Sequence, residues 1–181
     1  MHSSAYALFE TAIGRCGIAW GNRGVIGVQL PEPGGEAGTR ARVLRRFPDA
    51  QEASPPPEVQ AAIDGIVDLL HGEASDLAAV ALDMDGVPEF NRRVYEVARS
   101  IPPGATLTYG EVAARLGDRG AARAVGRALG QNPFALIVPC HRVLAASGGI
   151  GGFSAGGGVT TKRRLLTIED DGRSTPLFRS L

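Results

Sequence analysis

The sequence predicts an α/β protein of the α+β type, with a small N-terminal sheet-plus-helix domain and a mainly helical C-terminal domain that contains a helix-turn-helix. Three observations lead to this fold class. Short apolar and β-branched runs fill the first 30 of the 181 residues, helical periodicity dominates the second half, and the pattern changes at Asp-Gly-Val-Pro, residues 85–88. We therefore expect domains at residues 1–85 and 86–171 and a C-terminal tail at residues 172–181.

The N-terminal third contains three expected strands and two expected helices. Apolar and β-branched runs predict strands at residues 6–11, 17–20 and 25–30, and Gly-Asn-Arg-Gly predicts a turn between the last two. A helix is expected at residues 39–47, with Thr39 as its N-cap. Apolar residues at helical spacing predict a second helix at residues 58–71, with Gly72 as its C-cap.

Two further features complete the expected N-terminal domain. An apolar run at residues 77–84 predicts its last strand. Asp64, Asp68 and His71 lie on the second helix and could be read as metal ligands. Such a cluster is more often a solvated helix face, and we interpret it so.

The C-terminal half begins with a helix at residues 90–100, which the Pro-Pro-Gly sequence at residues 102–104 stops. Thr108 and Glu111 have the spacing of a capping box, which predicts the start of a helix at residues 110–116. After a glycine-rich turn at residues 117–120, a second short helix is expected at residues 121–129, closed by Gly130. Two short helices across a four-residue turn form a helix-turn-helix pattern.

The second of these helices is rich in small residues, including Ala122 and Gly126, and can approach another surface closely. Arg123 and Arg127 are four residues apart and share one side of it. One interpretation is a helix that enters a DNA groove with two cations. The other is close packing against a neighbouring helix, with both arginines in solvent. The spacing alone favours neither.

Composition and charge limit the class of protein. Hydrophobic residues make up 44% and charged residues 21%, which is typical of soluble globular proteins and excludes a largely disordered chain. No stretch approaches the roughly 18 consecutive apolar residues of a membrane span, and the first residues lack the pattern of a secretory signal. Cys16 and Cys140 cannot form a disulfide framework, and neither belongs to a CxxC pair. We expect a cytoplasmic protein with reduced thiols and no metal.

The net charge of zero conceals an uneven distribution along the chain. Residues 1–83 carry 6 basic and 11 acidic side chains, whereas residues 84–181 carry 13 basic and 8 acidic ones. Every cation except Lys162 is an arginine, a side chain suited to bidentate contacts with phosphates and bases. The basic half is a weak indication of a polyanionic partner, and a solvated surface with biased charge explains the count as well.

The sequence Leu-Ile-Val-Pro-Cys-His-Arg-Val at residues 136–143 is the most specific in the chain. Three apolar residues before Pro139 predict a buried, strand-like segment that delivers Cys140 to a fixed position. Because His141 and Arg142 follow directly, we expect the pKa of the Cys140 thiol to be lowered and the thiolate to be favoured. Cys140 is therefore a candidate nucleophile, in preference to a buried structural cysteine.

These motifs, taken together, resemble the O6-alkylguanine-DNA alkyltransferases, the methylated-DNA–protein-cysteine methyltransferase family. Pro-Cys-His-Arg-Val at residues 139–143 is similar to the family's active-site motif. The resemblance extends, in order and spacing, over about residues 87–170. It includes Ile-Pro-Pro-Gly at 101–104, Thr-Tyr-Gly at 108–110, Ala-Ala-Arg-Ala-Val-Gly at 121–126, Asn-Pro at 132–133, Gly-Phe-Ser at 152–154 and Leu-Leu-Thr-Ile-Glu at 165–169.

The resemblance implies a role for each matching residue. Cys140 would accept the alkyl group, His141 would act as a base through a bound water, and Glu169 would orient the imidazole. Asn132 would brace the turn around the site, and Tyr109 would give a proton or hydrogen bond to the guanine as it leaves. The residues that would bind the flipped guanine are Tyr109, Val143, Phe153 and Ser154.

The resemblance also implies the partner. Double-stranded DNA bearing O6-alkylguanine would be the substrate, with O4-alkylthymine as a further candidate lesion. Arg123 would fill the gap left by the extruded base. Arg127, Ala122 and Gly126 would complete a DNA-binding helix. No cofactor, membrane or protein partner is implied, and we expect a monomer.

Three other classes of protein fit the sequence less well. An alkyltransferase-like protein binds lesions without transfer and lacks the cysteine that this chain has at position 140. A helix-turn-helix regulator would need a dimer interface or a second half-site reader, and the sequence offers neither. A Cys-His hydrolase is disfavoured because Cys140 and His141 would point to opposite sides of one strand.

Overall fold

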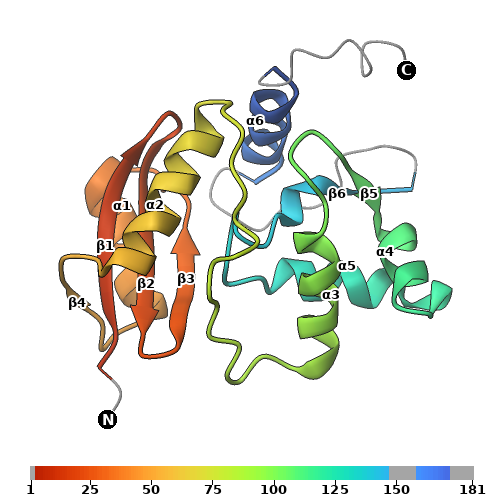
Figure 1. The fold of residues 1–181 in the computed structure, drawn as a ribbon, viewed down its shortest axis with the longest axis horizontal. Coiled ribbons are helices and arrows are strands. Elements are labelled where there is room, and N and C mark those ends of the chain that lie inside the picture. The colour runs from red at the N-terminus through yellow and green to blue at the C-terminus, as the bar shows by residue number, and fades with distance from the viewer. Residues whose placement is uncertain (1–2, 147–157, 172–181) are drawn as a thin grey trace.

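The computed structural model describes residues 3–146 and 158–171 and contains a sheet beside a group of helices (Figure 1). Its four strands are β1 (Ala5–Thr11), β2 (Gly14–Gly21), β3 (Gly24–Gln29) and β4 (Gln51–Glu52), in the order β3-β2-β1-β4. β1 pairs antiparallel with β2, β2 antiparallel with β3, and β1 parallel with β4. The predicted fold class is confirmed.

Helices α1 (Gly35–Arg46) and α2 (Pro57–Leu70) cover opposite faces of this sheet (Figure 1). Alternate residues of each strand face opposite sides, so each face has its own apolar set. Tyr6 and Ala19 pack with Val43 of α1. Ala7, Phe9 and Ile18 belong instead to the larger core, which also contains Ile63 and Ile66 of α2.

The second half contains α3 (Glu89–Arg99), α4 (Tyr109–Arg115), η1 (Arg119–Ala121), α5 (Ala122–Gly130) and α6 (Gly158–Asp171). Helices α4 and α5, separated by the short turn of η1, form the expected helix-turn-helix. The predicted capping box is present: Thr108 Oγ1 accepts from Glu111 N at 3.0 Å, and the Glu111 carboxylate accepts from Thr108 N at 3.2 Å. The Tyr95 hydroxyl on α3 donates to Ala128 O at 2.7 Å and ties α3 to α5.

A second, two-stranded sheet joins the segment that precedes α4 to the segment that contains Cys140. β5 (Leu107–Thr108) pairs in parallel with β6 (Val143–Leu144). β6 directly follows the turn η2 (Cys140–Arg142), and β5 directly precedes Tyr109. This pairing brings two predicted catalytic residues from distant parts of the chain to one place.

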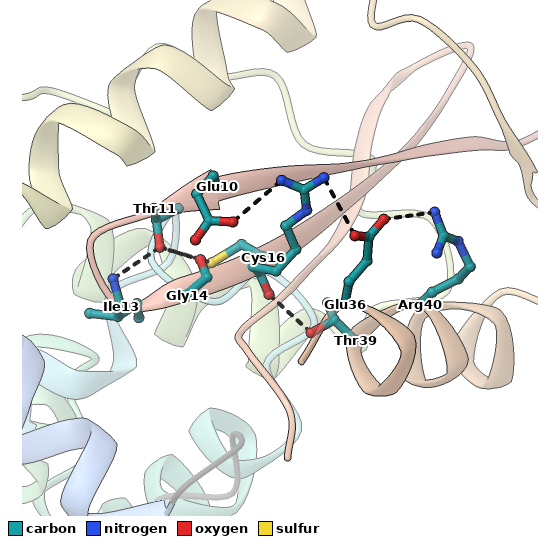
Figure 2. Close-up of polar contacts among 9 residues, drawn as sticks. Glu10, Thr11, Ile13, Gly14, Cys16, Glu36, Thr39 and Arg40 are labelled. Carbon is teal, nitrogen blue, oxygen red and sulfur yellow. Dashed lines mark hydrogen bonds and ion pairs between the residues drawn. The ribbon is translucent and has the colours of Figure 1, made fainter. Parts of the chain in front are cut away.

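The prediction that Thr39 caps α1 is wrong. The helix begins at Gly35, one turn earlier, and its N-cap is Gly34 with a φ of 94°. Glycine reaches this left-handed conformation at little cost, so two consecutive glycines start the helix before the threonine. Thr39 is buried instead, and its hydroxyl donates to Arg15 O at 3.0 Å (Figure 2).

The predicted strand at residues 77–84 is also wrong. This segment forms turns and a single bridge, between Leu82 and Val25 of β3. The Arg99 guanidinium on α3 donates to the carbonyls of Leu77, Ala78 and Val80, each at 2.9 Å. These carbonyls bond to a side chain in place of a strand partner, so pairing with β3 is confined to the bonds that Val25 makes with Ala81 O and Asp83 N.

One apolar core includes residues from both halves of the chain, such as Ile66 of α2, Val94 of α3 and Val125 of α5. The boundaries at residues 85 and 171 therefore stay predictions, and the tail at residues 172–181 lies outside the described residues. Within the described residues, no helix combines the length and apolar character needed to cross a membrane.

Candidate active site

A cavity of about 720 Å³ lies between α4, α5 and the segment after β6. Five of the predicted site residues line it, which shows that the fold assembles them around one space. They are joined by small and apolar residues of the same elements. The described lining consists of Tyr109, Gly110, Ala122, Arg123, Gly126, Leu129, Gly130, Cys140, Ala145 and Ala146.

Cys140 is presented to this cavity by a tight turn, and the prediction of a strand-like approach is wrong. Residues 136–137 form the turn, with Leu136 at a φ of 71° and a bridge between Ala135 and Val138. Cys140 then opens the 3₁₀ turn η2. Because Cys140 and His141 lie on a 3₁₀ turn, the alternation of side chains along a strand does not exclude a Cys-His hydrolase.

Asn132 lies beside this turn and makes two hydrogen bonds to it. Its amide Nδ2 donates to Val138 O at 2.9 Å, and its Oδ1 accepts from Phe134 N at 2.9 Å. The Cys140 backbone N–H donates to the same Val138 carbonyl at 2.8 Å. The Asn132 side chain thus holds both ends of the turn that carries the cysteine.

The Cys140 thiol has a raised pKa, which corrects the expected lowering. Burial is the largest influence and raises the pKa of Cys140, while hydrogen bonding from Asn132 and the positive charge of Lys162 lower it by less. The Arg142 guanidinium, which suggested the lowering, is paired with Glu169. The thiol therefore needs a base to form the thiolate at neutral pH.

His141 and Arg142 share one buried carboxylate, that of Glu169 on α6. His141 Nε2 lies 2.6 Å from Glu169 Oε1, and Arg142 Nη2 donates to the same oxygen at 2.7 Å. The Arg142 Nη1 also donates to Ile101 O at 2.7 Å. All three side chains are buried, so the network has no competition from solvent.

The charge state of Glu169 decides which nitrogen of His141 can act as a base. Burial would raise the pKa of Glu169, but the bonds from His141 and Arg142 outweigh it and lower the pKa to about 2. An ionised carboxylate only accepts, so His141 Nε2 must donate. Burial lowers the pKa of His141, which leaves a neutral ring with its lone pair on Nδ1. That atom is buried without a hydrogen-bond partner among the described residues.

Lys162 is a buried cation beside Cys140 and Tyr109 that the sequence did not indicate as a site residue. It is 1% exposed, its Nζ donates to Val143 O at 2.7 Å, and it lies 5.7 Å from the centre of the Tyr109 ring. Burial lowers the pKa of Lys162, and the neighbouring Cys140 raises it by less. The available signal was that Lys162 is the single lysine among 19 basic residues.

Of the four predicted guanine-binding residues, Tyr109 is the one found in the described lining of the cavity. Tyr109 lines the cavity, and burial together with the nearby Cys140 raises the pKa of its hydroxyl. Val143 is fully buried, its carbonyl accepts the Lys162 bond, and it is not among the described residues that line the cavity. Phe153 and Ser154 lie outside the described residues.

Helix α5 presents its two arginines to solvent. Val125, Ala128 and Leu129 face the core, whereas Arg123 and Arg127 are exposed. Arg123 lines the cavity mouth, and neither arginine has a hydrogen bond or ion pair with another described residue. The small residues Ala122 and Gly126 each precede one of these arginines and line the cavity. Both cations are therefore available to an outside partner.

The second cysteine, Cys16 on β2, is buried in the apolar core that packs against the sheet. Cys16 is 0% exposed, and its sulfur lies 3.7 Å from the Thr11 hydroxyl (Figure 2). Burial raises the pKa of Cys16 to about 12. Above it, Glu10, Arg15, Glu36 and Arg40 form a chain of ion pairs that ties β1 and β2 to α1 (Figure 2). Cys16 is therefore unable to compete with Cys140 as a nucleophile.

Among the described residues, no group of three or more His, Cys, Asp or Glu side chains could hold a metal ion. The polar side chains in the described lining are one thiol, one phenol and the guanidinium of Arg123. An imidazole, a carboxylate and an ammonium are buried close to Cys140. This set suits nucleophilic attack by sulfur with a neighbouring base.

Comparison with known proteins decides the family. Residues 89–171 match the model described as the DNA binding domain of 6-O-methylguanine DNA methyltransferase. The chain is 40% identical over 153 residues to a methylated-DNA–protein-cysteine methyltransferase of Methanothermobacter thermautotrophicus, a match that covers 84% of this chain and 78% of the relative. The chain belongs to the methylated-DNA–protein-cysteine methyltransferase family.

Solved structures of family members have the same fold. A crystal structure of Mycobacterium tuberculosis OGT in complex with DNA superposes with a TM-score of 0.75 at 34% identity, covering 93% of this chain and 94% of that one. O6-methylguanine-DNA methyltransferase from Pyrococcus kodakaraensis gives a TM-score of 0.67 at 26% identity, covering 92% and 98%. The similarity to these methyltransferases therefore includes the N-terminal sheet as well as the helical half.

The buried His141–Glu169–Arg142 network predicts a loss of stability in acid. The pKa of Glu169 falls from 4.5 to about 2 on folding, so its stabilisation is present above about pH 4.5 and is lost as the pH falls toward 2. The lowered pKa of His141 acts in the same direction below its ordinary value of 6.5, because the unfolded chain binds the proton more readily. Urea unfolding at a series of pH values should show this decline.

Glu169→Gln should flatten that decline below pH 4.5, although the variant is less stable at neutral pH. Asp170→Asn is the matched control, because Asp170 is the exposed neighbour on the same helix. Equal pH dependence in the wild type and Glu169→Gln would contradict the assignment of Glu169 as the acid-sensitive group.

Proposed function

We propose that this chain repairs alkylated DNA directly, by moving the alkyl group from guanine O6 to the sulfur of Cys140. The observation that carries the proposal is the placement of Cys140 in the wall of the 720 Å³ cavity. The next residue is His141, whose Nε2 is hydrogen-bonded to Glu169, so that Nδ1 is left to act as the base. The family includes proteins named for this transfer. A nucleophile, a base and a group that orients the base are the parts that such a reaction needs.

The reaction is a displacement at the alkyl carbon. The Cys140 proton passes to His141 Nδ1 through a water molecule, and the thiolate attacks the carbon opposite the guanine oxygen. The new S–C bond forms as the C–O6 bond breaks, and the electron pair of that bond stays on the guanine. Guanine then takes up one proton, so charge and atoms balance.

Tyr109 assists the departure of the guanine, and Lys162 assists the attack by the Cys140 sulfur. The Tyr109 phenol lines the cavity and would donate to the departing guanine, which gains negative charge as the bond breaks. The Lys162 ammonium stabilises the thiolate electrostatically, as its lowering effect on the pKa of Cys140 indicates. The effect of Lys162 is strengthened because its side chain is buried away from solvent.

The helix-turn-helix supplies the DNA-binding surface. Exposed arginines occur on α4, on η1 and twice on α5: Arg115, Arg119, Arg123 and Arg127. They suit phosphate contacts, and the small residues of α5 permit close approach to a groove. The target atom is inaccessible in stacked DNA, so the lesion base must be extruded into the cavity. We propose O6-alkylguanine in double-stranded DNA as the substrate and O4-alkylthymine as a second lesion.

The protein should act as a monomer. Val159, at 43% exposure, is the single large hydrophobic side chain exposed on the part of the chain that is described. The described surface thus has no extended apolar patch of the kind that marks protein–protein interfaces, which supports the proposal of a monomer. A monomer that carries both its own DNA-binding helix and its own nucleophile needs no partner for one transfer.

Each molecule should react once. A thioether is a poor leaving group, and the second thiol, Cys16, is sealed in the sheet and cannot regenerate Cys140. Incubation with duplex DNA that carries radiolabelled O6-methylguanine is expected to label the protein to a limit of one methyl per chain. Peptide mapping should place the label on Cys140.

The same experiment distinguishes the alternatives. Tight binding of lesion DNA without label on the protein would indicate a lesion-binding protein and contradict the proposal. Sustained turnover, or label on Cys16, would also contradict it. Binding that depends on an operator sequence and ignores the lesion would indicate a transcription regulator.

A further inference from the structure

Arg46, at the end of α1, connects the N-terminal sheet to the turn that holds the nucleophile. Its Nη1 donates to Val28 O at 3.0 Å and to Gln29 Oε1 at 3.1 Å, both on β3. Its Nη2 donates to Pro133 O at 2.8 Å, 87 residues further along the chain. The planar guanidinium can serve these three acceptors at once because its donors are fixed in a fork.

The close packing of the end of α1 against β3 fixes the position of Arg46. A Cβ atom at Gly27 would lie 2.5 Å from the Phe47 ring and 3.0 Å from Arg46 Nη2, so only glycine lets the end of α1 lie this close to the strand. The Arg46 guanidinium also lies 5.1 Å from the centre of the Phe47 ring. These contacts limit the directions in which the guanidinium can point.

Pro133 transmits this contact to the active site. Its carbonyl accepts from Val28 N at 2.9 Å as well as from Arg46. The residue before it is Asn132, whose side chain bonds Val138 O and Phe134 N and lowers the pKa of the Cys140 thiol. A displacement of Pro133 would therefore move the one side chain that spans the cysteine-bearing turn.

Packing alone does not fix Pro133 on this side. A second cavity, of about 300 Å³, is lined by Arg46 from α1, by Asn132 and Pro133, and by Cys140 itself. Side chains that border a cavity lose contacts on that side and can shift into it. Hydrogen bonds across the gap therefore restrain Pro133 on the side where packing contacts are missing.

We propose that Arg46 is a positioning residue for alkyl transfer, which holds Asn132 and Cys140 in the reactive arrangement through the Pro133 carbonyl. This inference rests on the proposed function and adds a specific role for the N-terminal half. Arg46 touches neither the alkyl group nor the reacting sulfur, so its effect is on geometry. A misplacement of about 1 Å can cost up to about 100-fold in rate.

The test uses the full-length protein and two reagents that need no DNA. Free O6-benzylguanine measures alkyl transfer, and iodoacetamide measures the reactivity of the Cys140 thiol across a pH series. Arg46→Met keeps the apolar part of the side chain and removes all three bonds. We expect it to react about tenfold more slowly with O6-benzylguanine, and its iodoacetamide profile to shift to higher pH as Asn132 loses its hold on the thiol.

Three further variants control for other causes. Arg45→Met removes the exposed neighbouring arginine and should leave the rate and the profile unchanged. Val43→Ala removes buried apolar contacts of the same helix and should lower the melting temperature without changing either. Arg46→Lys retains one donor for Pro133 O and should recover most of the rate. If Arg46→Met unfolds at the assay temperature, Arg46→Gln takes its place.

The outcomes separate the two proposals. An unchanged rate and profile in Arg46→Met would overturn the positioning role, as would an equal loss in Val43→Ala, which would indicate general destabilisation. Wild-type protein that takes up no methyl group from duplex DNA carrying labelled O6-methylguanine would instead refute the proposed function. The iodoacetamide profiles would still test the positioning role in that case.

Discussion

Serine in place of Cys140 is expected to abolish alkyl transfer while lesion DNA is still bound. The hydroxyl of serine is a far weaker acid than a thiol, and the neutral His141 cannot generate an alkoxide in quantity. The change removes one sulfur from the cavity wall and leaves the turn's own bonds, from Asn132 and the Cys140 backbone to Val138 O, in place. Label transfer and fluorescence anisotropy on the same lesion duplex measure the two properties.

Cys16→Ser is the matched control for this experiment. Cys16 is buried in β2 and contacts Thr11, so its loss should affect stability slightly and transfer not at all. Residual transfer in Cys140→Ser would mean that another residue accepts the alkyl group. Loss of transfer in both variants at full folding would exclude Cys140 as the sole acceptor.

Arg123→Ala is expected to lower the transfer rate on duplex DNA far more than on free O6-benzylguanine. Arg123 is exposed at the cavity mouth, where it would fill the gap left by the flipped base. Unstacking a base costs a few kcal/mol, and losing about 2 kcal/mol of compensation corresponds to about a 30-fold slower reaction. The free base enters the cavity without opening a duplex, so its rate should change little. Single-turnover measurements on both substrates provide the comparison.

Arg127→Ala is the control for charge on the same face of α5. It should weaken duplex binding and reduce its salt dependence by about one phosphate contact, with little effect on the rate at saturation. No change on either substrate in Arg123→Ala would favour a merely solvated arginine. Equal loss on both substrates would mean that Arg123 supports the cavity itself, and the gap-filling role would be wrong.

The elements that the sequence predicted correctly are those specified by local signals. The capping box of Thr108 and Glu111 satisfies its own backbone groups within four residues, so α4 could be recognised without knowledge of its neighbours. The strand at residues 77–84 was wrong because a distant residue, Arg99, takes the carbonyls that a strand would use. The Thr39 cap was wrong because two glycines start the helix a turn earlier.

In the candidate site, too, residues in local motifs could be predicted, whereas residues that act through distant contacts could not. Cys140, His141 and Glu169 could be named from the family resemblance, although their roles stay predictions, and the structure brings His141 and Glu169 into contact. Lys162 and Arg46 could not be named, because the residues that they contact, Val143 and Pro133, are 19 and 87 residues away in the chain. The direction in which the pKa of Cys140 is shifted could not be predicted from the sequence either. It depends on burial and on the pairing of Arg142 with Glu169, which adjacency along the chain does not reveal.

Helix α6 carries both Lys162 and Glu169, while the nucleophile lies before it in the chain. During synthesis the ribosome therefore releases Cys140 ahead of the residues that prepare it for reaction. Until α6 docks, His141 lacks the carboxylate that sets its tautomer, and the thiol lacks its neighbouring ammonium. A nascent or truncated chain thus exposes an ordinary cysteine, and the capacity for self-alkylation arises only when the whole described fold is complete.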